Sequence, residues 1–231
     1  MIKLGLIGKN IAHSKSQAMY EKLLDGPVDY SLLDYPQAED IPAITDLIEP
    51  FRGLSITTPY KETFIDQMDD IDPHVRELGA INCMVKNEGK LSATNTDFLA
   101  LKELLNSELE SYPASEVIIL GDGVMSRVTQ KVLELLGQDY TLFSRKKTER
   151  FASLNLMDCF SQDKKYKLCI NCCSRNYVYD GQISDEFFFW DLNYAFDPHV
   201  KRFENHKKTY RDGLDLLYKQ AEHALYFWNI L

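Results

Sequence analysis

The amino-acid sequence predicts an α/β protein made of two domains. Short apolar runs alternate along the chain with segments of helical spacing, a pattern typical of parallel strands joined by crossover helices. The alternation restarts after a polar segment, Ser107–Ser115, which we take as the linker because it contains Pro113. We therefore expect one domain at residues 1–106 and a second, Rossmann-like domain at 107–213. The last stretch, 214–231, is expected to form a helix that packs back on the first domain.

The first domain is expected to begin with a strand that ends at a glycine and to continue with alternating helices and strands. Asn87-Glu88-Gly89 separates two short apolar runs and predicts a hairpin between them. The predicted strands are Lys3–Ile7, Val28–Tyr35, Gly53–Thr57, Ile81–Lys86 and Lys90–Thr94, and the predicted helices are Ser16–Leu24, a stripe of apolar residues over 41–48, and Phe98–Leu105.

In the second domain, a fully apolar strand at Val117–Leu120 is followed at once by two glycines. A helix at Val128–Leu136 is closed by Gly137. Further elements are the strands Tyr140–Phe143, Lys167–Asn171 and Phe187–Leu192, and the helix Leu214–Trp228.

Composition narrows the class of protein. Hydrophobic residues make up 45% of the 231 residues, enough for a substantial core, and the net charge of −9 argues against a nucleic-acid binder. Apolar runs are all much shorter than the ~20 residues of a membrane span, and the first residues do not resemble a secretory signal. We therefore expect a cytoplasmic protein that binds neither nucleic acid nor membrane. We also expect a monomer or homodimer.

Five cysteines are present, and three of them, Cys169, Cys172 and Cys173, are close in sequence. The C-x-x-C spacing is that of half a zinc site, but a second pair at matching spacing is lacking. Because their neighbours predict a buried strand, we expect these cysteines to serve as small hydrophobic side chains and expect no metal.

A glycine turn follows the first strand of the second domain. Gly121-Asp122-Gly123-Val124-Met125-Ser126 has the form G-x-G-x-x-S between a strand and a helix. Such a turn brings backbone close to a pyrophosphate, which then contacts the N–H groups of the helix. An ordinary strand-to-helix turn is the alternative, and Asp122 adds a negative charge beside the expected anion.

The next strand ends in three cations, Arg145, Lys146 and Lys147. An NAD site normally presents an acidic residue here to the ribose hydroxyls, whereas a 2′-phosphate would be attracted to cations. Arg145 can bind a phosphate through two parallel hydrogen bonds. The cluster favours NADP, with a solvated charged loop as the alternative.

Lys61 and Asp97 are the candidate chemical centre of the first domain. Reducing a ketone by hydride requires a proton on the developing alkoxide, which a partly desolvated lysine held by a carboxylate can supply. Each residue also has an ordinary explanation when taken alone: Lys61 as a surface lysine at a helix start, and Asp97 as a helix N-cap.

Several segments in order resemble the shikimate dehydrogenase family, over nearly the whole chain. These are the stretch Gly5-Leu6-Ile7-Gly8-Lys9-Asn10-Ile11-Ala12-His13-Ser14-Lys15-Ser16, the motif Ser55-Ile56-Thr57-Thr58-Pro59-Tyr60-Lys61, Gly79-Ala80-Ile81-Asn82, Asn95-Thr96-Asp97, the glycine turn, Ser144-Arg145, Asp191-Leu192-Asn193-Tyr194, Asp212-Gly213-Leu214 and Gln220-Ala221-Glu222-His223-Ala224.

The resemblance implies an NADP-dependent oxidoreductase that interconverts 3-dehydroshikimate and shikimate, a step of aromatic amino acid biosynthesis. It implies Lys61 and Asp97 as the catalytic pair. The implied substrate residues are Ser14, Ser16, Thr57, Asn82, Tyr194 and Gln220, and the implied cofactor residues are Gly121, Gly123, Ser126, Arg127, Ser144, Arg145 and Lys146.

The sequence departs from the family pattern mainly around the cofactor. Val124 stands where a glycine is usual, and Lys146 where a threonine is usual. Gln17, Ser55, Phe98 and Asp215 are further departures. Two alternatives stay open: a non-catalytic relative that binds a shikimate-like ligand or a protein partner, and a quinate/shikimate dehydrogenase that uses NAD.

Overall fold

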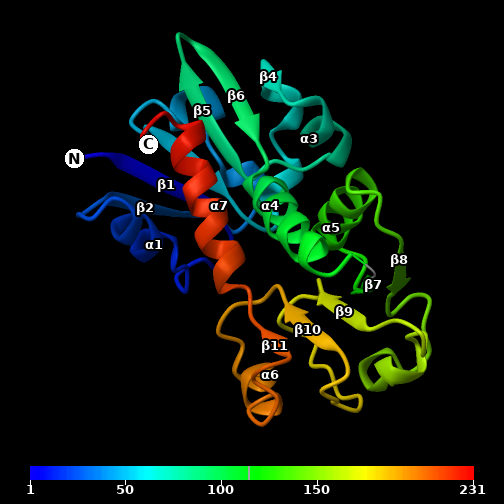
Figure 1. The fold of residues 1–231 in the computed structure, drawn as a ribbon. Helices are drawn as coiled ribbons and strands as arrows, with labels where there is room; N and C mark the ends of the chain where they lie inside the picture. Colours follow the sequence, from blue (N-terminus) through cyan, green and yellow to red (C-terminus); the bar gives the residue numbers. More distant parts are fainter. Residues whose placement is uncertain (114) are drawn as a thin grey trace. The chain divides into compact units, whose positions relative to one another are not determined.

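The computed structural model describes residues 1–113 and 115–231 and divides into two compact units (Figure 1). One unit comprises Met1–Ala100 and Leu217–Leu231, and the other Leu101–Leu216. Each unit has its own sheet and helices, which confirms the two-part α/β fold. The divisions at 100/101 and 216/217 fall inside the helices α4 (Thr96–Ser111) and α7 (Leu214–Phe227), whereas we had expected them at 106/107 and 213/214.

The first unit contains a mixed six-stranded sheet in the order β2-β1-β3-β5-β6-β4. β1, β2 and β3 are parallel, whereas β5 is antiparallel to both of its neighbours, because it forms the predicted hairpin with β6. The elements are β1 (Lys3–Gly8), α1 (Ser16–Leu23), β2 (Asp29–Asp34), α2 (Ile44–Leu47), β3 (Gly53–Ile56), β4 (Asp70–Ile71), α3 (Pro73–Leu78), β5 (Cys83–Asn87) and β6 (Lys90–Thr94). β4 and α3 are too short to show a periodic pattern and were not predicted.

The strand register brings the ends of several elements to one edge of this sheet. Gly8 at the end of β1 pairs with Asp34 at the end of β2, and Ile7 pairs with Ile56 at the end of β3. The peptide N–H of Ile56 donates to the carbonyl oxygen of Asn82, just before β5. The loops that follow β1 and β3 therefore emerge beside the segment that enters the hairpin, as parallel sheets arrange their ligand-binding edges.

The C-terminal helix α7 packs with α1 on the first unit's sheet, as predicted. Trp228 is fully buried among residues of β1, β5 and α1, and its indole N–H donates to the carbonyl oxygen of Met84 at 3.0 Å. Gly53 is required beneath this ring, because a Cβ there would lie 2.3 Å from the indole. The indole thus fixes the end of the chain to the sheet.

The second unit contains an all-parallel five-stranded sheet in the order β11-β10-β9-β7-β8. Because β8 lies on one side of β7 and β9 on the other, the chain reverses direction across the sheet at β7, where open α/β sheets bind ligands. The elements are β7 (Ser115–Leu120), α5 (Val124–Leu135), β8 (Tyr140–Phe143), β9 (Tyr166–Asn171), β10 (Phe188–Asp191), α6 (Asp197–Arg202) and β11 (Tyr210–Arg211).

The linker prediction was wrong over 107–111, because α4 continues to Ser111. The polar residues there form a helical face, and Glu108 accepts hydrogen bonds from the Tyr166 hydroxyl and, at 3.1 Å, from Arg211. The polar residues therefore belong to an exposed, ion-paired turn of the helix, and they do not interrupt it. Ala114, inside the predicted linker, lies outside the described residues.

Cys169 and Cys172 are buried, as expected for small hydrophobic side chains, whereas Cys173, for which the same was expected, is half-buried. In the described part of the chain, no group of three or more His, Cys, Asp or Glu side chains is arranged to hold a metal ion. Within the same residues, none of the helices has the length and apolar character needed to cross a bilayer.

Candidate functional site

Lys61 and Asp97 form a close ion pair in the first unit. The Lys61 Nζ donates to Asp97 Oδ2 at 2.5 Å, and the two side chains are only 12% and 7% exposed. Lys61 lies in a single helical turn after β3, and Asp97 lies in the first turn of α4. The pairing and the burial contradict the alternative that Lys61 is an ordinary surface lysine.

Asn95, and not Asp97, caps the N-terminus of α4. The side-chain oxygen of Asn95 accepts the peptide N–H of Phe98 at 3.0 Å, which is the usual N-cap interaction. Its amide group donates to the carbonyl oxygen of Ala80 at 2.9 Å, so that the cap is also fixed to the neighbouring loop. The Asp97 carboxylate is therefore not used as the cap and is directed to Lys61. The sequence placed Asn95 in a motif, but its capping role was missed.

Asn82 closes a ring of hydrogen bonds around the ion pair. Its side-chain oxygen accepts from the Thr96 peptide N–H at 2.6 Å and from the Thr96 hydroxyl at 3.1 Å. The adjacent Ile81 N–H donates to the carbonyl oxygen of Lys61 at 2.8 Å. Lys61 is thus connected to Asp97 both directly and through the Ile81–Asn82 backbone. The amide N–H₂ of Asn82 has no partner within the described part of the chain and is available to a ligand hydroxyl.

The loop after β1 presents Ser14 and Ser16. The Ser14 hydroxyl lies 3.2 Å from that of Ser16, and both side chains are half-buried. Asp34 holds this loop, because its carboxylate accepts the peptide N–H groups of Asn10 at 2.9 Å and Ile11 at 3.1 Å. Thr57 is half-buried at the end of the neighbouring β3. These hydroxyls lie at the same sheet edge as the ion pair.

The glycine turn of the second unit has the geometry expected for a pyrophosphate site. Gly121 has φ +107°, and a Cβ there would approach the Cys173 sulfur to 3.1 Å, so only glycine fits without displacement. Gly123 is extended and has open space around its Cα. The helix α5 begins at Val124, and the N–H groups of its first turn have no partner inside the helix. Backbone and helix therefore both suit an anion.

The end of β8 supplies the groups expected near a ribose phosphate. Ser144 is buried, and its hydroxyl has no hydrogen-bond partner among residues 1–113 and 115–231. Arg145 is exposed, and Lys146 forms an exposed ion pair with Asp122 at 3.4 Å. Lys146 thus partly neutralises the acidic residue of the glycine turn, which removes part of the objection to an anion there. The unpaired Ser144 hydroxyl and the Arg145 guanidinium fit a phosphorylated ribose.

Comparisons with known proteins find similarity in both sequence and fold. Residues 6–84 match the model of the shikimate dehydrogenase substrate binding domain. A shikimate dehydrogenase (NADP(+)) of Halothermothrix orenii is 32% identical in an alignment over 158 residues that covers 65% of this chain and 54% of the relative. Another, of Saccharolobus solfataricus, is 24% identical over 97% of this chain and 88% of its own. The chain is therefore similar to shikimate dehydrogenases over nearly its whole length.

The chain spans about half (54%) of the length of the Halothermothrix relative. The fold is shared over the entire chain with a crystal structure of a shikimate 5-dehydrogenase from Thermus thermophilus in complex with NADP(H) and shikimate. That structure has a TM-score of 0.76 at 22% identity, and the match covers 100% of this chain and 94% of the other.

Ser126 was predicted to line the cofactor site, and its side chain is fully buried. Its hydroxyl accepts from the Gln130 side chain at 3.0 Å, because the third residue of α5 faces the packed side of the helix. Only its backbone N–H remains suited to a ligand. Arg127, the next residue, is exposed.

Tyr194 and Gln220 belong to different units. Tyr194 follows β10 and is half-buried in the second unit, while Gln220 is half-buried on the part of α7 that belongs to the first unit. Their assignment to a substrate stays a prediction of the family resemblance.

The thiols beside the glycine turn should be unreactive in the folded protein. Burial raises the pKa of both Cys172 and Cys173 to about 12, although the Arg145 guanidinium opposes the shift at Cys173. Because the folded pKa is raised, both thiols stay neutral at pH 8 and do not repel a pyrophosphate. We expect alkylation at pH 8 to be about a thousandfold slower than for an ordinary thiol.

Mass spectrometry after iodoacetamide treatment measures the labelling of each cysteine. The unfolded protein in guanidinium is the control, in which all five cysteines should react at ordinary rates. Rapid labelling of Cys173 in the native protein would contradict the raised pKa.

Proposed function

We propose that this protein is an NADP-dependent shikimate dehydrogenase that reversibly reduces 3-dehydroshikimate to shikimate. The observation that carries the proposal is the buried ion pair of Lys61 and Asp97 at 2.5 Å, at the sheet edge that also bears Ser14, Ser16 and Asn82. A buried lysine held by one carboxylate is a suitable proton donor for a developing alkoxide. The cytoplasm, where such biosynthetic reactions take place, is the proposed location.

The proton chemistry is assigned to Lys61 Nζ. In the direction of reduction, Nζ donates a proton to the carbonyl oxygen of the substrate as that oxygen gains negative charge. In the reverse direction, Nζ receives the proton from the substrate hydroxyl. Asp97 holds the ammonium group in place and stabilises its charge, and its position in the first turn of α4 stabilises the carboxylate.

The polar groups of the first unit suit a polyhydroxylated acid. The hydroxyls of Ser14, Ser16 and Thr57 and the amide N–H₂ of Asn82 can exchange hydrogen bonds with hydroxyl and carboxylate groups. We assign Gln220 and Tyr194 to the same substrate on the strength of the family resemblance. The role of these groups is to bind and orient the reacting carbon, so that the proton transfer from Lys61 has the correct geometry.

The second unit is proposed to hold NADP, which when bound supplies the hydride. Gly121, Gly123 and the first N–H groups of α5 would contact its pyrophosphate. Ser144 and Arg145 would contact the 2′-phosphate, with Lys146 and Arg127 contributing positive charge nearby. The residues present therefore fit the group, with the exception of the Ser126 side chain.

A spectrophotometric assay tests the proposed activity. Purified protein mixed with shikimate and NADP⁺ should produce absorbance at the reduced-nicotinamide band, because the reaction is reversible. The absence of turnover at high protein and cofactor concentrations would contradict the proposal. Calorimetry with NADPH then decides whether the protein is a non-catalytic relative: the absence of micromolar binding would favour that alternative.

The pairing of Lys146 with Asp122 favours testing NAD as well as NADP, because it occupies one of the three cations. Rates measured for shikimate and quinate, each with NADP⁺ and NAD⁺, separate the possibilities. We expect NADP⁺ and shikimate to give the highest kcat/KM.

A further inference from the structure

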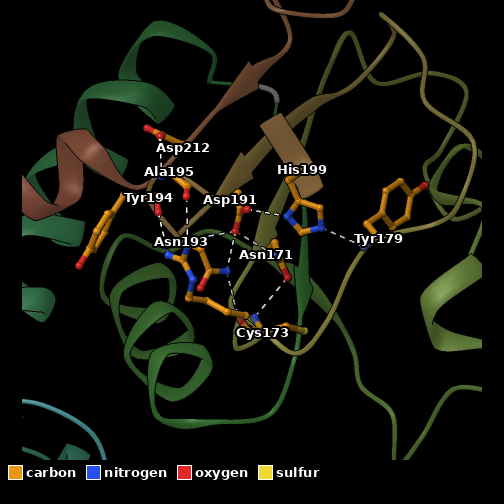
Figure 2. Close-up of polar contacts among 10 residues, drawn as sticks. Asn171, Cys173, Tyr179, Asp191, Asn193, Tyr194, Ala195, His199 and Asp212 are labelled. Carbon is orange, nitrogen blue, oxygen red and sulfur yellow. Dashed lines mark hydrogen bonds and ion pairs between the residues drawn. The ribbon is translucent and has the colours of Figure 1, made fainter. Parts of the chain in front are cut away.

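A buried histidine–aspartate pair lies in the second unit, outside the residues assigned above (Figure 2). Nδ1 of His199, on α6, lies 2.6 Å from Oδ2 of Asp191 at the end of β10, and both side chains are fully buried. Nε2 of His199 accepts the peptide N–H of Tyr179 at 2.9 Å. Since Nε2 is an acceptor, the ring proton must be on Nδ1, and His199 donates it to Asp191.

The other carboxylate oxygen of Asp191 accepts hydrogen bonds from the side-chain amides of two asparagines. Oδ1 accepts from Asn171 Nδ2 at 2.9 Å, from Asn193 Nδ2 at 2.8 Å and from the Asn193 peptide N–H at 3.0 Å. Asn171 and Asp191 are paired neighbours at the ends of β9 and β10. His199 therefore occupies Oδ2 while three donors converge on Oδ1, which determines the orientation of the carboxylate.

The same two asparagines hold the backbone of Cys173 from both sides. The Asn171 side-chain oxygen accepts the Cys173 N–H at 3.2 Å, and Asn193 Nδ2 donates to the Cys173 carbonyl oxygen at 3.0 Å. Figure 2 shows this chain of contacts running from Tyr179 through His199 and Asp191 to Cys173.

The glycine turn packs against Cys173. A Cβ on Gly121 would lie 3.1 Å from the sulfur of Cys173 and 3.3 Å from its peptide nitrogen. A displacement of the Cys173 backbone would therefore move the surface that determines where Gly121 lies, and with it the backbone expected to approach a pyrophosphate.

We propose that His199 is a positioning residue for the cofactor, which acts through Asp191 and the two asparagines to hold Cys173 against the glycine turn. This inference rests on the proposed binding of NADP. His199 does not contact the ligand in this proposal; it keeps the Asp191 carboxylate oriented, and the carboxylate keeps the two amides oriented. The alternative is that His199 only fills space in the core.

The surroundings of His199 allow the two roles to be separated. Its ring packs edge-on against Phe189, Phe196 and Tyr177, with centroid distances of 5.7, 4.9 and 6.4 Å. Phenylalanine at position 199 keeps this aromatic packing but removes the donor to Asp191. Asparagine loses the packing but places an N–H₂ donor at the same distance from the backbone as Nδ1. The two substitutions therefore have opposite consequences for the two roles.

The experiment compares the dissociation constant for NADPH, measured by calorimetry on the folded protein, in the variants His199→Phe and His199→Asn. The positioning role predicts that His199→Phe raises the dissociation constant about tenfold, as for the loss of one hydrogen bond to a buried charged group. It predicts that His199→Asn, although less stable to heat, binds within about threefold of the wild type. If His199→Phe binds as well as the wild type, or if His199→Asn binds more weakly than His199→Phe, the proposal is overturned.

His206→Phe is the matched control, because His206 forms a 2.7 Å pair with Asp185 that is exposed to solvent. It should leave NADPH binding unchanged. Should His199→Phe fail to fold, Asn193→Ala decides the question, since it removes the Asn193 link between Asp191 and Cys173 but leaves the buried pair and the Asn171 link intact. Unchanged NADPH affinity in Asn193→Ala would overturn the inference alone, whereas absence of NADPH binding to the wild type would overturn the proposed function as well.

Discussion

Replacing Lys61 with alanine should lower kcat for shikimate oxidation by about a hundredfold to ten-thousandfold, the range for loss of a general acid–base group. The expected effect on KM is smaller, because the proton transfer contributes mainly to the transition state. The physical reason is that Nζ is the only group of the pair that carries a proton to exchange, while Asp97 orients it at 2.5 Å. Steady-state kinetics at saturating NADP⁺ measures both parameters.

Lys86→Ala is the matched control for this substitution. Lys86 also pairs with a carboxylate, that of Glu49, in the same unit, but Glu49 is 61% exposed. Removal of the Lys86 side chain should leave kcat unchanged. Because Lys61→Ala leaves the buried Asp97 carboxylate without its partner, melting temperatures are compared to confirm that the variant is folded. A kcat within about threefold of the wild type in folded Lys61→Ala would show that the proton comes from another group.

Replacing Arg145 with alanine should raise KM for NADP⁺ by about tenfold to a hundredfold, the size expected for a charge-assisted hydrogen bond to a phosphate. KM for NAD⁺, which lacks the 2′-phosphate, should change little. The exposed guanidinium at the end of β8 follows the buried, unpaired hydroxyl of Ser144 in the chain, at the place where a ribose is expected. The measurement is kcat/KM for both cofactors with shikimate as the common substrate.

Lys164→Ala provides the control for charge alone. Lys164 is an exposed cation of the second unit just before β9, whereas the ligand edge of the sheet lies at the other end of that strand. It should not alter the ratio of kcat/KM between the two cofactors. An equal loss for NADP⁺ and NAD⁺ in Arg145→Ala would mean that Arg145 does not contact the 2′-phosphate.

Most of the regular elements were predictable from the sequence because their signals are local. The four longer strands of the second unit are rich in apolar residues, since both faces of a parallel sheet are largely covered, and each was found within about two residues of its predicted position. The short elements β4, α3, α6 and β11 were missed, because two to six residues do not establish a period. The end of α4 was misplaced because its last turns are polar, a property that an exposed helix and a loop share.

Some residues of the candidate site could be predicted from the sequence, and others could not. Gly121 could be recognised from the sequence. Its backbone has a positive φ, which favours glycine, and the turn shows a glycine pattern. The residues next to Lys61 and Asp97 in the sequence could not distinguish a functional pair from a surface lysine and a helix cap. Ser126 is buried, and its place at the cofactor stays a prediction, because a position in a motif does not tell which face of the helix a side chain occupies.

By itself, the sequence determined the α/β class, the order of the main elements and the chemical types present at each strand end, because periodicity and turn residues act over a few positions. Only the tertiary structure decided that Asn95 takes the cap and releases Asp97 to Lys61, 36 residues away. The same holds for His199, which the sequence did not single out. Hydrogen bonds between distant side chains depend on strand register and helix orientation, and these are set by the packing of the whole unit.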